Sequence, residues 1–529
     1  MSRFNLIDEK WIPVRFPDGT RDELGILDTL MRSKEIAVIE DPSPLVVAAL
    51  HRFLLAILYR ALEGPTDIDE AKTLFKEGIP GEKIVVYLKK WRDWFWMFDE
   101  KHPFYQVSSY EPQVKKGKKE WRSWPAVAAE HNANNAKVLF DHVKVAAAGS
   151  IPSSMAARWL VACQTFALGG GNSDFVYTKS APSATAVMVL PLGISLHDTL
   201  LFCLVPENKK VLDADRPIWE QEPVPLASLK NGVARRAMGT ADLYTWLSRA
   251  IKFHLIGNGD TLSELAFASG VEFTSEGCVD SMLGYRIDDK KGKVSIPFRE
   301  RGLWRDFDSL LPDESHLAPQ VMEHATALTR PNRERYPRSV IVLGQANNKA
   351  KIEYWRMERF ALPEALVGDR CIRTEIRQLL SESEKAERAL ERSLRTAAKL
   401  IISRGERELQ ADKWSAGKWM PGDVSKFLGK NTFEAVPVAL GSYWSTLEAG
   451  FHEILREYTL GRDSEDIRCQ WLKTVRDGLR VAWEQHRTYA SMGDAWTIRA
   501  LVKAEESVLR KLKELNSEIL KLEPQEEDA

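Results

Sequence analysis

The chain has 529 residues, of which 44% are hydrophobic and 28% charged, and its formal net charge is −1. This length exceeds one ordinary core and predicts two to four domains, and the composition excludes a disordered chain and favours a soluble globular one. The near-zero charge excludes a polyanion-binding field over the whole surface, so local charge clusters carry more information than the total.

The N-terminal segment shows no targeting signal. Its first residues lack a charged start followed by an apolar stretch, which predicts a cytoplasmic protein. The most apolar stretch, Leu45–Leu62, contains His51, Arg52 and Arg60, so it predicts a buried amphipathic helix rather than a membrane span. The five cysteines form no Cys-x-x-Cys pair, so we expect reduced thiols rather than disulfides or a zinc ribbon.

A long loop is predicted from Tyr110 to Ala148, after an aromatic run that begins at Trp91 and is typical of core packing. The loop contains a basic cluster, Lys115–Arg122, with Trp121 interleaved, which is either a solvated loop or a polyanion contact. Phe140 lies in a polar part of the loop. It is either a wedge or stacking residue or a simple anchor of the loop.

The glycine segment, Leu168–Asn172, contains Gly169, Gly170 and Gly171. Three glycines carry no side chain to block close approach, and their N–H groups can meet phosphate or groove edges directly, which suggests a nucleic acid as ligand. The run matches neither the dinucleotide fingerprint nor a Walker A loop, and a plain turn-forming loop is the alternative.

Motifs for catalysis are missing from the rest of this region. The dipeptide His197-Asp198 occurs in some metal-dependent phosphohydrolases, but no further ligands can be assigned, so we expect a turn here, with no metal, no cofactor and no catalytic residue. The segment Asp289–Lys293 has the pattern of a basic hairpin tip.

From about Gly368 the pattern changes to long segments with 3.6-residue periodicity. The sequence therefore predicts an α+β N-terminal domain with long loops over residues 1–367 and an all-α domain over residues 368–529. In the second domain we expect a four-helix bundle, with Asp494 as the N-cap of its last helix and Ile498 on that helix's apolar seam. The helices are expected near residues 371–404, 432–460, 464–488 and 494–522.

Several separated segments occur in an order that resembles the CasA family, the large subunit of the type I-E CRISPR surveillance complex Cascade. The resemblance extends over nearly the whole chain and is carried by Phe4–Val14, His102–Val107, Leu168–Gly171, Trp304–Asp306 and Gly344–Ile352.

The resemblance implies a non-catalytic, DNA-binding subunit of a multi-subunit, RNA-guided antiviral defence complex. Such a subunit recognises the protospacer-adjacent motif (PAM) in double-stranded DNA and helps to open the duplex, while guide pairing reads the target. It implies partners as well: the 5′ handle of the crRNA, the backbone and small subunits, and the helicase-nuclease that the complex recruits.

Three DNA-contacting elements are implied by the family pattern. The glycine segment, with Gly169, Gly170, Gly171 and Asn172, is the first, and the basic hairpin tip, with Lys290 or Lys291, is the second. The third is a wedge that splits the duplex, in a segment where the family has Asn-Gln-Ala.

The wedge is where this chain departs from the family. Asn348-Lys349-Ala350 places lysine where glutamine is usual, and a lysine offers no amide acceptor to a base edge. A shifted loop would make Gln345 the wedge instead, so both residues stay candidates.

A contact loop for the crRNA handle and a neighbouring subunit is also implied by the resemblance. Leu139, Phe140, Asp141 and His142 are its counterpart here. Two other functions stay open: a scaffold or non-specific DNA clamp that does not read the PAM, and an autonomous metal nuclease that uses His197-Asp198.

Overall fold

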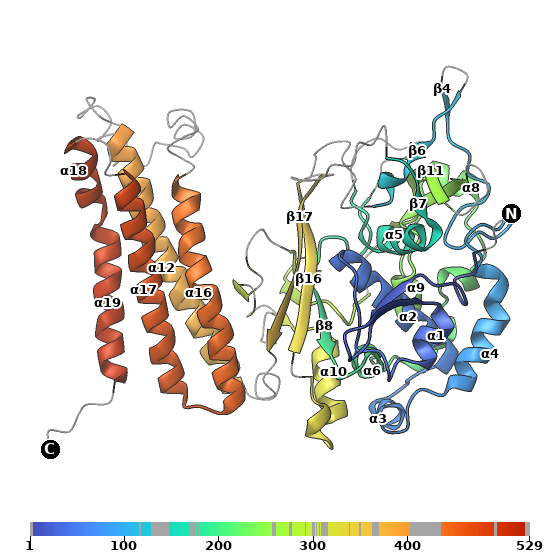
Figure 1. Ribbon diagram of the computed structural model, residues 1–529, viewed down its shortest axis with the longest axis horizontal. Coiled ribbons are helices and arrows are strands. Elements are labelled where there is room, and N and C mark those ends of the chain that lie inside the picture. Colours follow the sequence, from blue (N-terminus) through green and yellow to red (C-terminus); the bar gives the residue numbers. More distant parts are fainter. Residues whose placement is uncertain are drawn as a thin grey trace. The chain divides into compact units, whose positions relative to one another are not determined.

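The computed structural model divides the chain into two compact units, which are described separately (Figure 1). The N-terminal unit comprises Met1–Leu303 and Ser309–Phe360, and the helical unit comprises Trp304–Asp308 and Ala361–Ala529. The structure describes residues 4–115, 118–128, 148–169, 175–176, 179–255, 261–274, 278–290, 292–298, 302, 304–305, 307, 316–337, 339–348, 351–361, 370–402, 435–490 and 495–523.

The central helix of the N-terminal unit is α2 (Pro44–Leu62). It begins where the Ser43 hydroxyl accepts the Val46 N–H and where Pro44, which has no N–H to leave unpaired, takes the first helical position. Every residue of α2 except Arg60 is buried, so the predicted amphipathic character is wrong and the predicted burial is confirmed. The helix is apolar on nearly all sides because it packs against other parts of the unit on all sides.

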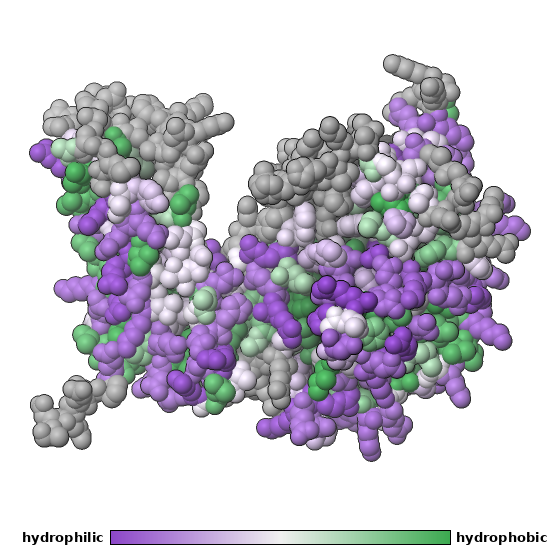
Figure 2. All heavy atoms as spheres, in the orientation of Figure 1, coloured by the Kyte–Doolittle hydropathy of each residue, from purple (hydrophilic) through white to green (hydrophobic). Residues whose placement is uncertain are grey.

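By length and composition α2 could also cross a membrane, and it is the one such helix in the described part of the chain. However, 94% of its apolar window is buried inside the protein. On the face shown in Figure 2, the N-terminal unit carries mostly hydrophilic side chains with small apolar groups between them. These observations identify α2 as a core helix.

Other helices surround α2, among them α4, α5 and α9, which all contact it (Figure 1). Their apolar faces complete the core around it. The helices of this unit are α1 (Ile26–Met31), α3 (Ile68–Glu77), α4 (Gly81–Trp91), α5 (Ser153–Phe166), α6 (Leu196–Cys203), α7 (Lys209–Ala214), α8 (Leu226–Asn231), α9 (Thr240–Tyr244) and α10 (Gln320–Thr329), with short 3₁₀ turns η1 (Arg92–Trp94), η2 (Trp124–Ala126), η5 (Ile218–Glu220) and η7 (Arg333–Arg335).

Several small sheets replace one large sheet in the N-terminal unit. Their orders are β2-β1-β3, β10-β11-β6 with β7 on β11, β14-β13-β15 and β17-β16-β8, and two further pairs are β4-β5 and β9-β12. The strands are β1 (Ile12–Arg15), β2 (Arg21–Leu24), β3 (Val38–Ile39), β4 (Val114–Lys115), β5 (Lys118–Lys119), β6 (Arg122–Ser123), β7 (Ile151–Pro152), β8 (Met188–Leu192), β9 (Ala234–Arg235), β10 (Arg249–Leu255), β11 (Thr261–Ser269), β12 (Glu272–Phe273), β13 (Tyr285–Asp288), β14 (Gly292–Ser295), β15 (His316–Leu317), β16 (Ser339–Asn348) and β17 (Lys351–Ala361).

Among its described residues, the helical unit contains no strand apart from Ala361, the last residue of β17. Its helices pack through the predicted apolar stripes, in which Ile376, Leu390, Leu447 and Leu455 are fully buried. The helices are α12 (Arg370–Ile402), α16 (Ala435–Leu460), α17 (Ser464–Ala490), α18 (Ala495–Ala504) and α19 (Glu506–Leu522).

The last predicted helix differs from the structure in two ways. It is divided at Glu505 into α18 and α19, at the position where the apolar seam of the sequence is broken. Ile498 is 49% exposed, so its place on the seam was wrong, and its neighbour Thr497 is buried instead. Leu501, which was also predicted on the seam, is buried. The predicted N-cap, Asp494, lies outside the described residues.

A short segment far upstream, Trp304–Asp308, belongs to the helical unit. Trp304 is 1% exposed, and its ring lies 5.2 Å from Phe451 and 5.5 Å from Trp444. The sequence-based division, which placed all residues before Gly368 in one domain, did not foresee this insertion. The core of the helical unit therefore depends on a tryptophan that precedes its first long helix by more than 60 residues.

Candidate nucleic-acid interface

The glycine segment follows α5, and bonds between its two flanks close its base. The Ala181 N–H donates to the Ala167 carbonyl (2.8 Å), and the Gly169 N–H donates to the Ser180 hydroxyl (2.8 Å). Residues 167–169 and 180–181 are thereby held together. Gly170, Gly171 and Asn172 lie outside the described residues.

A buried arginine of β10 also holds the start of the glycine segment in place. Arg249 is 2% exposed, and its two terminal nitrogens donate to the carbonyls of Ser248 (2.6 Å) and Leu168 (2.7 Å). Burial away from water lowers the pKa of Arg249 to about 10, which still leaves it charged at neutral pH. A guanidinium with several fixed donors suits this role, because it can serve two backbone carbonyls at once.

Gln345 connects the base of the glycine segment to another strand. It lies in β16 with no exposed surface, and its amide nitrogen donates to the carbonyls of Phe166 (2.6 Å) and Ala184 (2.8 Å). A side chain in this position is not free to enter DNA. Of the two wedge candidates, the buried geometry of Gln345 argues against it, because the strand Ser339–Asn348 continues past it without the shifted loop that the alternative required.

The other wedge candidate follows the end of this strand. β16 ends at Asn348 and β17 begins at Lys351, and the two strands are neighbours in one sheet (Figure 1). Lys349 and Ala350, together with the side chain of Asn348, lie outside the described part of the chain.

The basic hairpin predicted at Asp289–Lys293 is confirmed. β13 and β14 pair antiparallel from Tyr285↔Ser295 to Asp288↔Gly292, and Gly292 has a φ of +69°, which favours glycine. Lys290 is exposed at the tip, where its N–H donates to the Asp288 carboxylate (3.0 Å). Lys291 lies outside the described residues.

Described residues that flank the three elements meet at one segment, residues 181–192, which we call the shared root. On one side β8, within this root, pairs with β16 from Leu192↔Ser339 to Met188↔Leu343. On the other side the N–H groups of Val187 and Val189 donate to the carbonyls of Ile296 and Met282, both at 2.9 Å. The root thus continues from the glycine segment and lies between the strand that leads to Asn348 and the residues that flank the basic hairpin.

Close packing at this root requires a glycine in β16. A Cβ built on Gly344 would lie 2.5 Å from the ring of Phe298 and 2.9 Å from the Ala186 carbonyl oxygen. Phe298 is itself fixed, because its N–H donates to the Thr185 carbonyl (2.8 Å). The backbone geometry of the root is therefore determined by backbone hydrogen bonds and by one glycine.

A buried ion pair lies under the root. Arg52 of α2 contacts Asp280 at 2.6 Å and Ser183 at 3.2 Å, and the guanidinium carbon lies 4.0 Å from the centre of the Tyr244 ring. Arg52 is 1% exposed and Asp280 is 4% exposed. A buried pair of this kind is costly to break, because either partner alone would be an uncompensated charge. It ties the shared root to the central helix.

The basic cluster Lys115–Arg122 forms part of a second hairpin, β4–β5, and is partly neutralised. Glu111 accepts from Lys119 and from Lys252, both at 2.6 Å. Trp121 stacks on His254, with ring centres 4.2 Å apart and an interplanar angle of 12°. The cluster was interpreted either as a solvated loop or as a polyanion contact. These ion pairs argue against a strong polyanion contact.

The predicted crRNA-handle loop cannot be placed. Leu139, Phe140, Asp141 and His142 lie outside the described residues, and so do all of residues 129–147. The aromatic run before it is placed, and Phe95 within it is fully buried, as expected for core packing.

His197 and Asp198 occupy the first turn of α6 rather than the predicted turn, and both are buried. The Nδ1 of His197 lies 3.3 Å from the Ser33 hydroxyl, and Asp198 pairs with Arg335 at 2.5 Å. Burial lowers the pKa of His197 to about 4. In the described part of the chain, no group of three or more His, Cys, Asp or Glu residues is arranged to hold a metal ion.

The chain matches the family model of the CRISPR-associated protein Cse1 over residues 5–482. It is 30% identical to the CRISPR-associated protein CasA/Cse1 of Thermus thermophilus over 527 residues, which cover 98% of this chain and 99% of that protein. The solved structure of Thermus thermophilus CasA has a TM-score of 0.79 at 28% identity and covers 97% of this chain and 100% of its own. A chain of a CRISPR RNA-guided surveillance complex has a TM-score of 0.70 at 18% identity, covering 96% and 100%, and shares the fold.

Proposed function

The chain belongs to the CRISPR-associated Cse1 (CasA) family, and on this premise we propose that it is the large, non-catalytic subunit of a type I-E RNA-guided surveillance complex. In this role it recognises the PAM in double-stranded DNA, helps to open the duplex for crRNA pairing and recruits the helicase-nuclease. It acts in the cytoplasm, without a cofactor, next to the crRNA 5′ handle and the backbone and small subunits.

The observation that supports DNA recognition is the shared root. Three segments proposed to contact DNA are far apart in sequence, yet described residues that flank each of them hydrogen-bond to residues 181–192. Anchoring by backbone hydrogen bonds on a buried core gives a rigid platform from which the three segments can contact one duplex together. Separate, unconnected loops would not hold a common register.

Each element supplies a different kind of contact. The glycine segment allows the backbone to approach a groove closely, and Lys290 places a cation at an exposed hairpin tip. Lys349 follows β16 and is proposed as the wedge. The family pattern implies an approach to the PAM from the minor groove. Readout from that groove distinguishes few base pairs, so we expect tolerance of several PAM sequences.

The electrostatics favour action within a complex. The net charge is −1, and Glu111 pairs with Lys119 of the hairpin β4–β5 and with Lys252, which offsets part of their positive charge. The free chain is therefore expected to bind DNA weakly, with an affinity that falls with salt by a log–log slope of about −0.9 per phosphate contacted.

We further infer that the helical unit is a four-helix bundle in which α18 and α19 act as one interrupted helix. In support, α12 contacts α16, α17, α18 and α19, and α17 contacts α16 and α19. The Leu509 N–H donates to the Glu505 carbonyl (2.9 Å), so helical hydrogen bonding resumes directly after the interruption. Its proposed role is to contact neighbouring subunits and DNA.

The test is the affinity of a reconstituted crRNA complex, with and without this chain, for duplexes with a randomised PAM. We expect a chain-dependent gain of about 1–3 kcal/mol per discriminated base pair. The variants Lys290→Ala, Lys349→Ala and Gly170→Asp should each weaken DNA binding while crRNA loading stays intact. Lys230→Ala, which removes another exposed lysine in the last turn of α8, is the matched control and should change nothing.

The scaffold alternative makes the opposite forecast. If the chain raises affinity equally for every PAM, it is a scaffold or a non-specific clamp, and the three elements lose their proposed role. If PAM preference is present but the variants match the wild type, recognition lies elsewhere on the chain.

A further inference from the structure

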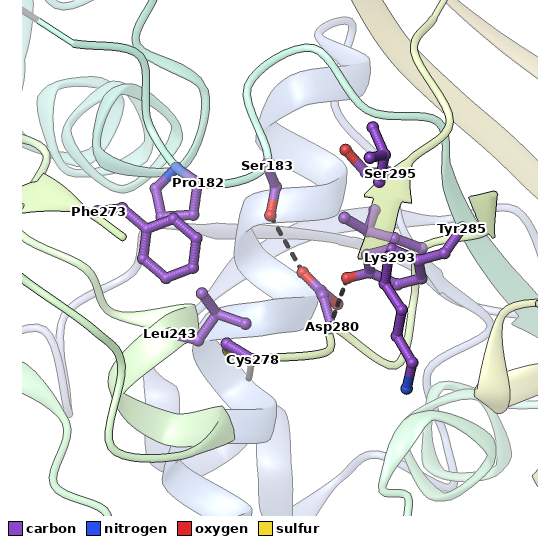
Figure 3. Close-up of a pocket in the computed structure, with 11 residues that line it drawn as sticks. Pro182, Ser183, Leu243, Phe273, Cys278, Asp280, Tyr285, Lys293 and Ser295 are labelled. Atoms are coloured by element: carbon purple, nitrogen blue, oxygen red, sulfur yellow. Dashed lines mark hydrogen bonds between the residues drawn. The ribbon is translucent and has the colours of Figure 1, made fainter. Parts of the chain in front are cut away.

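A cavity of about 460 Å³ lies directly beside the shared root (Figure 3). Figure 3 shows Pro182, Phe273 and Leu243 on one side of it and Tyr285, Lys293 and Ser295 on the other, with Ser183 and Asp280 between. The volume is within the range of small-ligand sites. One side of it comes from the basic hairpin proposed to contact DNA, because Lys293 and Ser295 belong to β14, and Pro182 and Ser183 belong to the shared root.

The first wall is apolar and suits stacking. Phe273 is half-buried and contacts Trp246 in a T-shaped arrangement, with ring centres 5.4 Å apart. Cys278 also lines this cavity, and burial raises the pKa of its thiol to about 12, so the thiol is uncharged. A flat, neutral ring can lie against such a wall without losing solvation of a charge.

The opposite wall offers hydrogen bonds. The Tyr285 oxygen accepts the Asp280 N–H (2.7 Å), and no other bond to it is found in the described part of the chain, so its own hydrogen remains available to donate. Burial raises the pKa of Tyr285 well above the ordinary value, which keeps that hydrogen in place. A hydroxyl also stands at Ser295. Hydroxyls both donate and accept, so they tolerate different ligand edges.

Charge is distributed unequally around the cavity. The Asp280 carboxylate is occupied, because it accepts from Arg52 (2.6 Å), Ser183 (3.0 Å) and the Met282 N–H (3.0 Å). Lys293 is exposed, and among the described residues it forms no ion pair. The cavity thus combines a neutralised floor with a free cation at its edge, which is suitable for a ligand that joins a flat polar ring to a phosphate.

We propose that this cavity receives one unpaired nucleobase of the DNA strand that is displaced when the duplex opens, while Lys293 contacts an adjacent phosphate. The proposal rests on the proposed function and extends it. Taking a base out of the stack is costly, and a site that stacks and hydrogen-bonds that base offsets the cost. A base held here also slows reclosure of the duplex, because it is not available to pair with the target strand.

The experiment measures the rate of duplex opening by the assembled complex, with displaced strands that carry a single abasic sugar at successive positions beside the PAM. On intact DNA, Phe273→Leu is expected to open DNA about 10-fold more slowly than the wild type. At one position the abasic sugar should abolish this difference, because the wild type then has no base to capture. Phe98→Leu, the same change at another half-buried phenylalanine, is the control and should behave as wild type.

A difference of about 10-fold that persists at every abasic position would overturn the proposal, since Phe273 would then act through the fold or through another strand. Equal rates for both proteins on intact DNA would also overturn it. Lys293→Gln, at an exposed position, provides a second test: the salt slope of binding should decrease by about 0.7, the value for one phosphate of a single strand, and an unchanged slope contradicts the phosphate contact. If the wild-type complex showed no PAM preference in the same assay, the proposed function itself would fail.

Discussion

Gln345 shows how one buried amide can determine the position of elements at the surface. Its nitrogen holds the carbonyls of Phe166 and Ala184, which lie before and after the glycine segment. Without this amide, both carbonyls would lose this donor. An unpaired buried polar group costs about 1–3 kcal/mol. Gln345 is therefore expected to act as a positioning residue.

The substitution Gln345→Met keeps the approximate shape of the side chain and removes the donor. We expect the free energy of unfolding of the N-terminal unit to fall by about 2–4 kcal/mol, measured by urea denaturation. Gln378→Met, at an exposed helical position, is the matched control and should change stability by less than about 0.5 kcal/mol. A variant that retains full stability would contradict this positioning role.

At the scale of elements, patterns with a local cause were predictable and packing between distant segments was not. The Lys-Lys-Gly run predicted the β13–β14 hairpin, because a charged tip with glycine is a local turn signal. The burial of Gln345 was signalled by the apolar run Val340–Leu343 just before it, which is typical of an interior strand. Periodicity could not show that α2 is buried on all sides or that Trp304 enters the helical unit, since both depend on tertiary contacts.

We expect the segment Trp304–Asp308 to contribute to the stability of the helical unit. Trp304 contacts Trp444, Phe451 and Trp471, and Arg305 pairs with Glu387 at 3.1 Å. Trp304→Ala would leave a large cavity among these rings, at a cost of about 3–5 kcal/mol. Hydrogen exchange in α16 and α17 should accelerate accordingly, although the mutation lies outside both helices.

The control for this prediction is Trp94→Ala in the N-terminal unit, where Trp94 packs on Trp91 and His102. That variant should leave exchange in α16 and α17 unchanged. Unchanged exchange in the Trp304→Ala protein would show that the helical unit folds without its upstream segment.

At the scale of the whole molecule, buried titratable groups make the stability of the N-terminal unit depend on pH. His51, His197 and His324 are buried, and burial lowers the pKa of each to about 4. The unfolded chain takes up these protons first, near pH 6.5, so the stability present above that pH is lost as the pH falls toward 4. Asp215 has the opposite sign, because burial raises its pKa to about 6 and the folded state is protonated first.

Three histidines outweigh one aspartate in this balance. Between pH 7.5 and 5.5 we expect the free energy of unfolding of the N-terminal unit to fall by roughly 3 kcal/mol, measured by urea denaturation. His51→Gln should make this fall smaller by about 1 kcal/mol, because one proton-accepting site of the unfolded chain is gone. Asp215→Asn should make it larger by a similar amount, because the offsetting group no longer titrates. If the fall in both variants equalled that of the wild type, other groups would control the acid sensitivity of this unit. Burial of these four side chains would then not limit its stability below pH 6.5.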